Sequence, residues 1–170
     1  PRARGRARSN LVNAIPISQR PAEVDTRSTP GHWEGDFIKG KGNRSAVGTL
    51  VERQSRMLLL THVKGCTAQA AHDGFAQRLK RVPSPLRKTL TYDRGSEMAL
   101  HEELAQKLEI KIYFCEPHSP WQRGSNENMN GLVRQYLPKG TDLSVYSQEH
   151  LDAIADQIND RPRKGLGVRS

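Results

Sequence analysis

Few cysteines and no long apolar run mark this sequence, and each of these features excludes a class of protein. Cys66 and Cys115 are isolated and form no CxxC pair, which argues against a zinc site or a disulfide framework. No run of about 18 apolar residues is present, so no membrane span is expected. The first residues also lack the apolar core of a signal peptide. We therefore expect a cytoplasmic protein without a membrane partner.

Acidic residues are also scarce relative to basic ones. The 170 residues include 27 Lys and Arg against 18 Asp and Glu, which gives a net charge of +9. Such an excess is typical of a protein that binds a polyanion, and nucleic acid is the usual one. The alternative is a soluble basic protein without such a partner. The length suffices for one domain with a buried core.

The first 29 residues differ in composition from the rest. The stretch PRARGRARSN carries four arginines and no apolar run, and the following residues up to Pro30 hold several prolines without periodicity. This pattern predicts a basic linker or arm over residues 1–29, lying on the surface. A disordered tail and an arm that contacts DNA remain equally compatible with it.

Regular patterns begin at Pro30. Three apolar, β-rich runs separated by short polar turns predict two successive hairpins over residues 33–40, 45–54 and 57–65. Thr67 can cap a helix that extends to Val82, and residues 86–93 and 110–117 read as further strands. A second helix is expected to begin at Ser96. Because strands joined through helices favour parallel pairing, we predict a five-stranded mixed sheet flanked by helices.

A further helix is indicated near the C-terminal end. Ser119, Pro120 and Gln122 match the N-terminal signal of a helix, with a capping box, and Pro138 and Gly140 mark its end. Its middle, GSNENMNG, consists of poor helix formers, each costing roughly 0.5–1 kcal/mol relative to alanine. A local violation inside a well-marked helix is often functional.

Glu127 is the only acidic residue in this helix. Arg123, Asn130 and Arg134 lie on the same helical side at spacings of four, three and seven residues. A carboxylate flanked by arginines and amides suits a metal ion beside a phosphate backbone. An ordinary solvated polar face is the alternative.

Two more carboxylates accompany strands. Asp36 lies in the first strand, where Glu34 and Ile38 share its face, and burying an unpaired carboxylate there would be costly. Asp93 ends the fourth strand in the stretch DRGSE, where an aspartate commonly opens a turn. The question is whether Asp93 only starts a turn or belongs to a set of carboxylates that hold a cation.

Four stretches together resemble a known family. GHWEGD, YDRGSEM, PHSPWQRGSNENMNGLVRQYLPKGTDL and INDRPRKGLG are similar to the catalytic core of the insertion-sequence-thirty family of bacterial transposases. That family belongs to the superfamily of DDE transposases and retroviral integrases. The resemblance spans residues 20–167, and the core domain is expected over residues 30–170.

The resemblance implies a ribonuclease-H-like fold and a triad of Asp36, Asp93 and Glu127 that binds metal and catalyses DNA transposition and integration. Asp36 and Asp93 would then face each other on adjacent strands, where like charges repel unless cations bind between them. Carboxylate oxygens suit Mg²⁺, with Mn²⁺ as a substitute. Two metals would support strand nicking and joining by phosphoryl transfer. The expected partners are double-stranded DNA, as element ends and target, and further copies of the chain in a homo-oligomer.

Other residues are assigned with the same site in view. Those expected to contact DNA are Arg123, Asn126, Asn130, Arg134 and His118. Glu97 and Glu34 are weaker candidates for the metal site, with Glu97 better explained as an acid at a helix start. Trp121 and Tyr92 are expected to be structural.

The resemblance has two departures. The helix-turn-helix region that such transposases carry has no counterpart here, and the chain stops soon after INDRPRKGLG. We therefore expect an isolated catalytic domain, associated with the bacterial nucleoid. A ribonuclease-H-like nuclease and a non-catalytic DNA-binding remnant remain alternatives.

Overall fold

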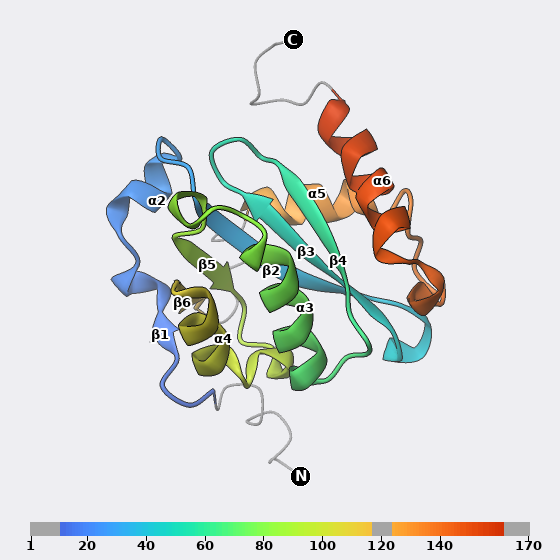
Figure 1. The fold of residues 1–170 in the computed structure, drawn as a ribbon, viewed down its shortest axis with the longest axis horizontal. Helices are drawn as coiled ribbons and strands as arrows, with labels where there is room; N and C mark the ends of the chain where they lie inside the picture. Colours follow the sequence, from blue (N-terminus) through green and yellow to red (C-terminus); the bar gives the residue numbers. More distant parts are fainter. Residues whose placement is uncertain (1–10, 117–123, 162–170) are drawn as a thin grey trace.

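The computed structural model describes residues 11–116 and 124–161, with backbone alone for 124–127 (Figure 1). A six-stranded sheet with the order β1-β6-β5-β2-β3-β4 forms the centre. One side of the sheet is the expected antiparallel meander of β2 (His32–Lys39), β3 (Ala46–Glu52) and β4 (Leu58–His62). The other strands, β5 (Thr89–Tyr92), β6 (Lys111–Phe114) and β1 (Ile15–Pro16), run parallel to β2 or to one another. The mixed sheet is confirmed.

Helices cover both faces of the sheet (Figure 1). On one face, α3 (Ala68–Lys80) and α4 (His101–Leu108) pack on side chains that include Trp33 and Phe37 of β2. On the other, α5 (Gly124–Val133) and α6 (Gln148–Asp160) pack on Ile38 of β2 and on residues of β3 and β4. The alternation read from the sequence of β2 therefore separates two apolar cores.

Local signals explain most helix boundaries. The Thr67 side chain accepts a hydrogen bond from the Ala70 amide at 3.1 Å, so it caps α3 as expected. The second helix does not begin at Ser96: a 3₁₀ turn (Ser96–Met98) comes first, and α4 starts at His101. Leu104 and Leu108 of α4 are buried.

The end of α5 also differs from the expectation. Regular helix ends at Val133, although the Leu137 amide still donates to the Val133 carbonyl at 2.9 Å. Pro138 follows, and proline disfavours helical conformation in the residue before it. The expected start of this helix, with Ser119, Trp121 and Gln122, lies outside the described residues.

Residues 11–29, part of the expected linker or arm, pair with the sheet. They contribute one extra strand, which explains why the sheet has six strands rather than the expected five. Within this segment β1 pairs with β6, and a short helix, α2 (Ala22–Thr26), follows. Arg20 Nη1 donates to Thr91 Oγ1 at 3.0 Å, which ties the segment to β5. The His101 ring contacts the Val12 carbonyl at 2.7 Å. Because these attachments are polar, they leave no apolar periodicity in the sequence.

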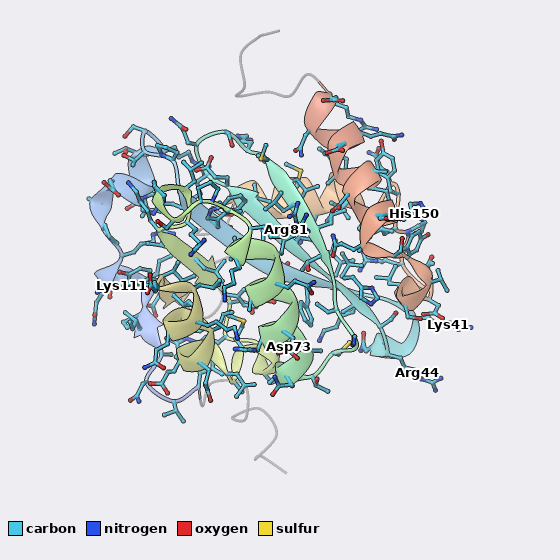
Figure 2. The ribbon with its side chains drawn as sticks, viewed as in Figure 1. Lys41, Arg44, Asp73, Arg81, Lys111 and His150 are labelled. Atoms are coloured by element: carbon cyan, nitrogen blue, oxygen red, sulfur yellow. The ribbon has the colours of Figure 1, made fainter. Side chains whose placement is uncertain are left out.

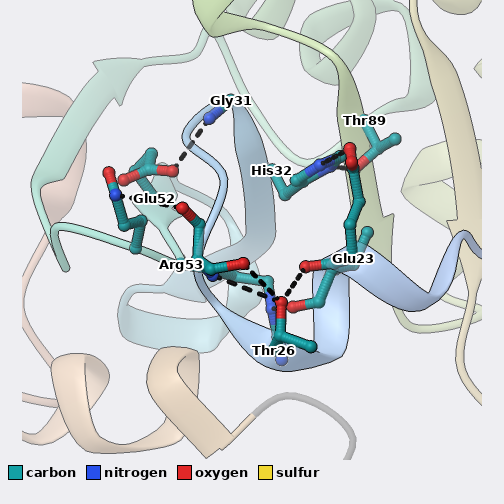
Figure 3. Close-up of polar contacts among 10 residues, drawn as sticks. Glu23, Thr26, Gly31, His32, Glu52, Arg53 and Thr89 are labelled. Atoms are coloured by element: carbon teal, nitrogen blue, oxygen red, sulfur yellow. Dashed lines mark hydrogen bonds and ion pairs between the residues drawn. The ribbon is translucent and has the colours of Figure 1, made fainter.

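A cluster of polar contacts joins this segment to the start of β2 (Figure 3). The His32 ring lies between Thr89 Oγ1, at 2.8 Å, and Glu23 Oε2, at 2.7 Å. Arg53 Nε donates to the Val24 carbonyl at 3.1 Å. The segment therefore packs on the sheet through specific hydrogen bonds.

Glu34 and Arg53 form a buried ion pair beneath α2. The guanidinium of Arg53 donates to Glu34 Oε2. Arg53 is 5% exposed and Glu34 is 0% exposed. Burial lowers the pKa of Arg53, and the Glu34 charge opposes that shift. Glu34 was a weak candidate for the metal site; its carboxylate instead stabilises the strand that carries Asp36.

Among the helices in the described part of the chain, none combines the length and apolar character that a bilayer crossing requires.

Candidate active site

Asp36 is half-buried in β2, on the face that α5 covers. Its Oδ1 accepts a hydrogen bond from the Phe37 amide at 2.8 Å. Its Oδ2 accepts one from Asn130 Nδ2 of α5, also at 2.8 Å. The carboxylate is therefore oriented from the strand and from the helix, while remaining accessible enough to meet a ligand.

Asp93 follows the last residue of β5 and is also half-buried. Its Oδ1 accepts a hydrogen bond from the Gly95 amide at 2.9 Å, so it opens a turn, as a lone aspartate after a strand commonly does. This hydrogen bond orients the carboxylate at the start of the turn.

The register of β2 and β5 relates the two aspartates. These strands are adjacent and parallel, as expected, and His32 pairs with Thr89 and Glu34 with Thr91. The pairing ends at Glu34 and Thr91; continued by two residues, the same register would bring Asp36 opposite Asp93. Neighbouring strands lie about 4.8 Å apart, so we expect the two aspartates to be close.

The side chain of Tyr92 lies on the opposite face of the sheet, and the charges of both aspartates affect its pKa. Its side chain is fully buried in the core beneath α3, which confirms the expected structural role. Burial raises the pKa of Tyr92 well above its ordinary range, and the charges of Glu97, Asp36 and Asp93 raise it further. The charges of both aspartates thus act on the same phenol.

Glu97 is held by the same tyrosine. Its carboxylate is 8% exposed and accepts a hydrogen bond from Tyr92 Oη at 2.9 Å. A Cβ built on Gly95 would lie 2.7 Å from Glu97 Oε1, so a larger residue there would displace the Glu97 carboxylate. Glu97 thus fastens the turn that carries Asp93 to the core, a role that the sequence did not indicate.

The Tyr92–Glu97 pair leads to a prediction for alkaline pH. Because the folded state raises the pKa of Tyr92 above the unfolded value of about 10, its stabilising contribution is complete below that pH and is lost as pH rises through the folded pKa. We expect Tyr92→Phe to lower the free energy of unfolding by about 1–3 kcal/mol near neutrality, since the buried carboxylate loses a donor. The difference from wild type should narrow above about pH 10, as measured by urea unfolding across pH. A constant difference would contradict the prediction.

Glu127, the third expected carboxylate, lies on α5 three residues before Asn130. Residues at this spacing share one side of a helix, and Asn130 contacts Asp36. The contact of Asn130 therefore places this part of α5 against β2, and the Glu127 side chain lies outside the described atoms. The same holds for the Asn126 side chain, while His118 and Arg123 lie outside the described residues.

Arg134 serves as an anchor of α5. Its Nη2 donates to the Lys39 carbonyl of β2 at 3.0 Å and its Nη1 to the Leu137 carbonyl at 3.2 Å. Burial lowers the pKa of Arg134, and the nearby Asp36 charge opposes the shift. The guanidinium therefore lies near the candidate site with two donors directed at backbone carbonyls. Its expected contact with DNA stays a prediction.

The donor set fits hard divalent cations. Asp36 and Asp93 supply carboxylate oxygens, the ligands that Mg²⁺ and Mn²⁺ prefer. Within residues 11–116 and 124–161, side chains of 124–127 excepted, no group of three or more His, Cys, Asp or Glu is arranged to hold a metal. A complete site would therefore need Glu127 as its third carboxylate, so the triad stays a prediction.

Comparisons with known proteins agree with this arrangement. Residues 27–120 match the family described as Integrase core domain. The chain is 59% identical over 171 residues to the transposase for insertion sequence element IS1086 of Cupriavidus metallidurans, covering 100% of this chain and 50% of that protein. It is 47% identical over 161 residues to transposase InsI for insertion sequence element IS30A of Escherichia coli, covering 95% and 42%. The chain thus spans about half the length of these relatives.

A solved structure resembles the fold. It is the simian T-cell lymphotropic virus intasome in complex with PP2A regulatory subunit B56 gamma, with a TM-score of 0.59 and 20% identity, covering 78% of this chain and 49% of that chain. At that identity the likeness concerns the fold alone, which is ribonuclease-H-like. The chain belongs to the integrase core domain family.

Proposed function

We propose that this chain is the catalytic core of a DNA transposase that nicks a strand at the end of a mobile element and joins it to target DNA. The observation that supports the proposal is the parallel pairing of β2, which carries Asp36, with β5, which Asp93 directly follows. Two like charges that lie close together favour a bound cation between them. The position of α5, which carries Glu127, supports a third carboxylate at the same place.

Each residue of the site would have its own role in the reaction. Asp36, Asp93 and Glu127 would hold Mg²⁺, or Mn²⁺ in its place, which when bound activates the attacking oxygen and stabilises the leaving oxygen in a phosphoryl transfer. The protein contributes preorganisation: the amides of Phe37 and Gly95 orient the two aspartates before DNA arrives. The same carboxylates would serve both nicking, with water as nucleophile, and joining, with a DNA 3′-hydroxyl.

The protein would act on double-stranded DNA within the bacterial nucleoid, as a homo-oligomer that brings two element ends together. A direct test incubates the chain with supercoiled plasmid and Mg²⁺ or Mn²⁺. We expect relaxed circles to appear with either metal and to disappear when a chelator is added. Cleavage of an RNA–DNA hybrid in preference to plasmid would favour the ribonuclease-H-like nuclease. Failure to bind Mn²⁺ would favour the non-catalytic remnant.

Arg123 provides a test of the DNA-binding side. It precedes Glu127 by one helical turn in sequence, and we expect it to neutralise a backbone phosphate. Arg123→Ala should weaken binding to all duplex sequences alike and reduce the slope of log affinity against log salt by about 0.9. Fluorescence anisotropy with short duplexes at several salt concentrations measures both quantities.

A matched control lies on the other face of the sheet. Arg81 is exposed at the end of α3 (Figure 2), and α3 and α5 cover opposite faces. Arg81→Ala removes the same charge and should leave the slope nearer to that of the wild type. Equal slopes for Arg123→Ala and wild type would show that the Glu127 side of α5 does not meet DNA.

A further inference from the structure

Two side chains, one in α5 and one directly after it, attach the helix to β2. Asn130 Nδ2 donates to Asp36 Oδ2 at 2.8 Å, and Arg134 Nη2 donates to the Lys39 carbonyl at 3.0 Å. The neighbouring residues Met129 and Val133 are buried in the apolar core that includes Ile38 of the same strand. The polar contacts select the position of α5 along β2, since apolar packing alone is less directional.

The two attachments differ in what they hold. Arg134 holds a backbone carbonyl, so it fixes the helix without touching the carboxylate. Asn130 holds the carboxylate itself. Because Phe37 N binds the other oxygen at 2.8 Å, the two donors together restrict rotation of the Asp36 side chain.

The chemistry of the amide also matters. An asparagine side chain is a neutral donor, whereas a lysine or arginine in its place would supply a positive charge. Asn130 therefore orients Asp36 without neutralising the charge that would attract a cation.

We propose that Asn130 is a positioning residue, which orients Asp36 for a divalent cation. This assignment rests on the proposed function. It differs from the contact with DNA that the sequence predicts for Asn130. Groups that orient metal ligands by hydrogen bonds typically affect metal affinity by about 10- to 100-fold when removed.

Metal binding in the absence of DNA is the first test. We expect Asn130→Ala to weaken Mn²⁺ binding by roughly 10- to 100-fold in calorimetric titration. The matched variant Arg134→Ala loses the other helix attachment and a positive charge near Asp36, so it should bind Mn²⁺ at least as tightly as wild type. The opposite directions separate orientation of Asp36 from mere attachment of the helix.

The outcomes distinguish this assignment from the proposed function. If wild type binds Mn²⁺ and Asn130→Ala binds it equally well, the positioning role is overturned and the proposed function stands. Equal weakening by both variants would also overturn it, since attachment of α5 would then suffice. If wild type binds no Mn²⁺, the proposed function fails and the positioning role fails with it.

A second measurement needs no alanine variant at position 130. In the metal-free protein, the side-chain amide NMR signals of Asn130 should shift when Asp36 is changed to Ala. Asn13, whose amide donates to Glu102 Oε2 at 2.9 Å, is an internal reference that should not shift. Unshifted Asn130 signals would overturn the contact on which the assignment depends.

Discussion

Replacing Asp93 with alanine should abolish metal-dependent nicking of plasmid DNA while leaving the fold intact. With Asp36 on the neighbouring strand β2, the Asp93 side chain would supply one of two carboxylates, and the remaining aspartate cannot hold the same cations alone. Because changes in residues that merely orient metal ligands cost about 10- to 100-fold, loss of a ligand should exceed about 100-fold. Initial rates of plasmid relaxation in Mg²⁺ and Mn²⁺ measure the effect.

Stability should change little in the same variant. Asp93→Ala removes the hydrogen bond from the Gly95 amide, worth about 0.5–1.5 kcal/mol. Thermal unfolding would register that loss separately from the loss of nicking. A variant that nicks DNA at near wild-type rate in Mg²⁺ would remove Asp93 from the site.

Asp73 offers the matched control for this experiment. It is an exposed aspartate on α3 (Figure 2), on the face of the sheet opposite α5, and it bonds Gln69 Nε2 at 2.9 Å. Asp73→Ala removes the same charge from the chain at a distance from the candidate site. We expect it to nick DNA as wild type does, so a loss in both variants would point to net charge rather than to metal binding.

Replacing Arg53 with methionine should destabilise the protein by about 3–5 kcal/mol, because it removes the cation that faces a buried carboxylate. Glu34 is 0% exposed, so water cannot replace the lost partner. Arg53 also donates to the Val24 carbonyl, and its loss should loosen α2 from the sheet. Urea unfolding at neutral pH measures the change in the free energy of unfolding.

The double variant Glu34→Leu with Arg53→Leu separates charge burial from packing. Replacing a buried ion pair by apolar residues is often neutral or stabilising, so the double variant should be more stable than Arg53→Met. If Arg53→Met lowers the free energy of unfolding by less than about 1 kcal/mol, other groups stabilise the Glu34 charge without Arg53. Because Glu34 and Asp36 share one face of β2, we also expect nicking to weaken in Arg53→Met as the strand loosens.

Local patterns in the sequence were sufficient for much of the fold. The alternation of Trp33, Phe37 and Ile38 placed β2 between two cores, and Thr67 marked the start of α3. The hairpin turns and the helical connections predicted a mixed sheet, and the family resemblance implied that β2 lies beside β5; both are confirmed. These signals are short-range, since strand period, helix period and caps depend on residues within a few positions of each other.

The expectations that failed involve partners distant in the chain. β1 contains two residues, and its pairing partner β6 begins about a hundred positions later, so no local period announces it. The 3₁₀ turn before α4 was missed because the Tyr92–Glu97 hydrogen bond and the close packing on Gly95 shape that segment. In both places, tertiary contacts outweigh the local preference.

The candidate site divides in the same way. The sequence by itself determined the residue types and, through strand and helix periods, the faces on which Asp36 and Glu127 lie; the family resemblance joined them with Asp93. Only the tertiary structure decided that Asn130 binds Asp36, that Arg134 binds the Lys39 carbonyl, and that Glu34 pairs with Arg53. The physical reason is that a side-chain hydrogen bond depends on distance and direction in space, which a linear pattern of residue types does not encode.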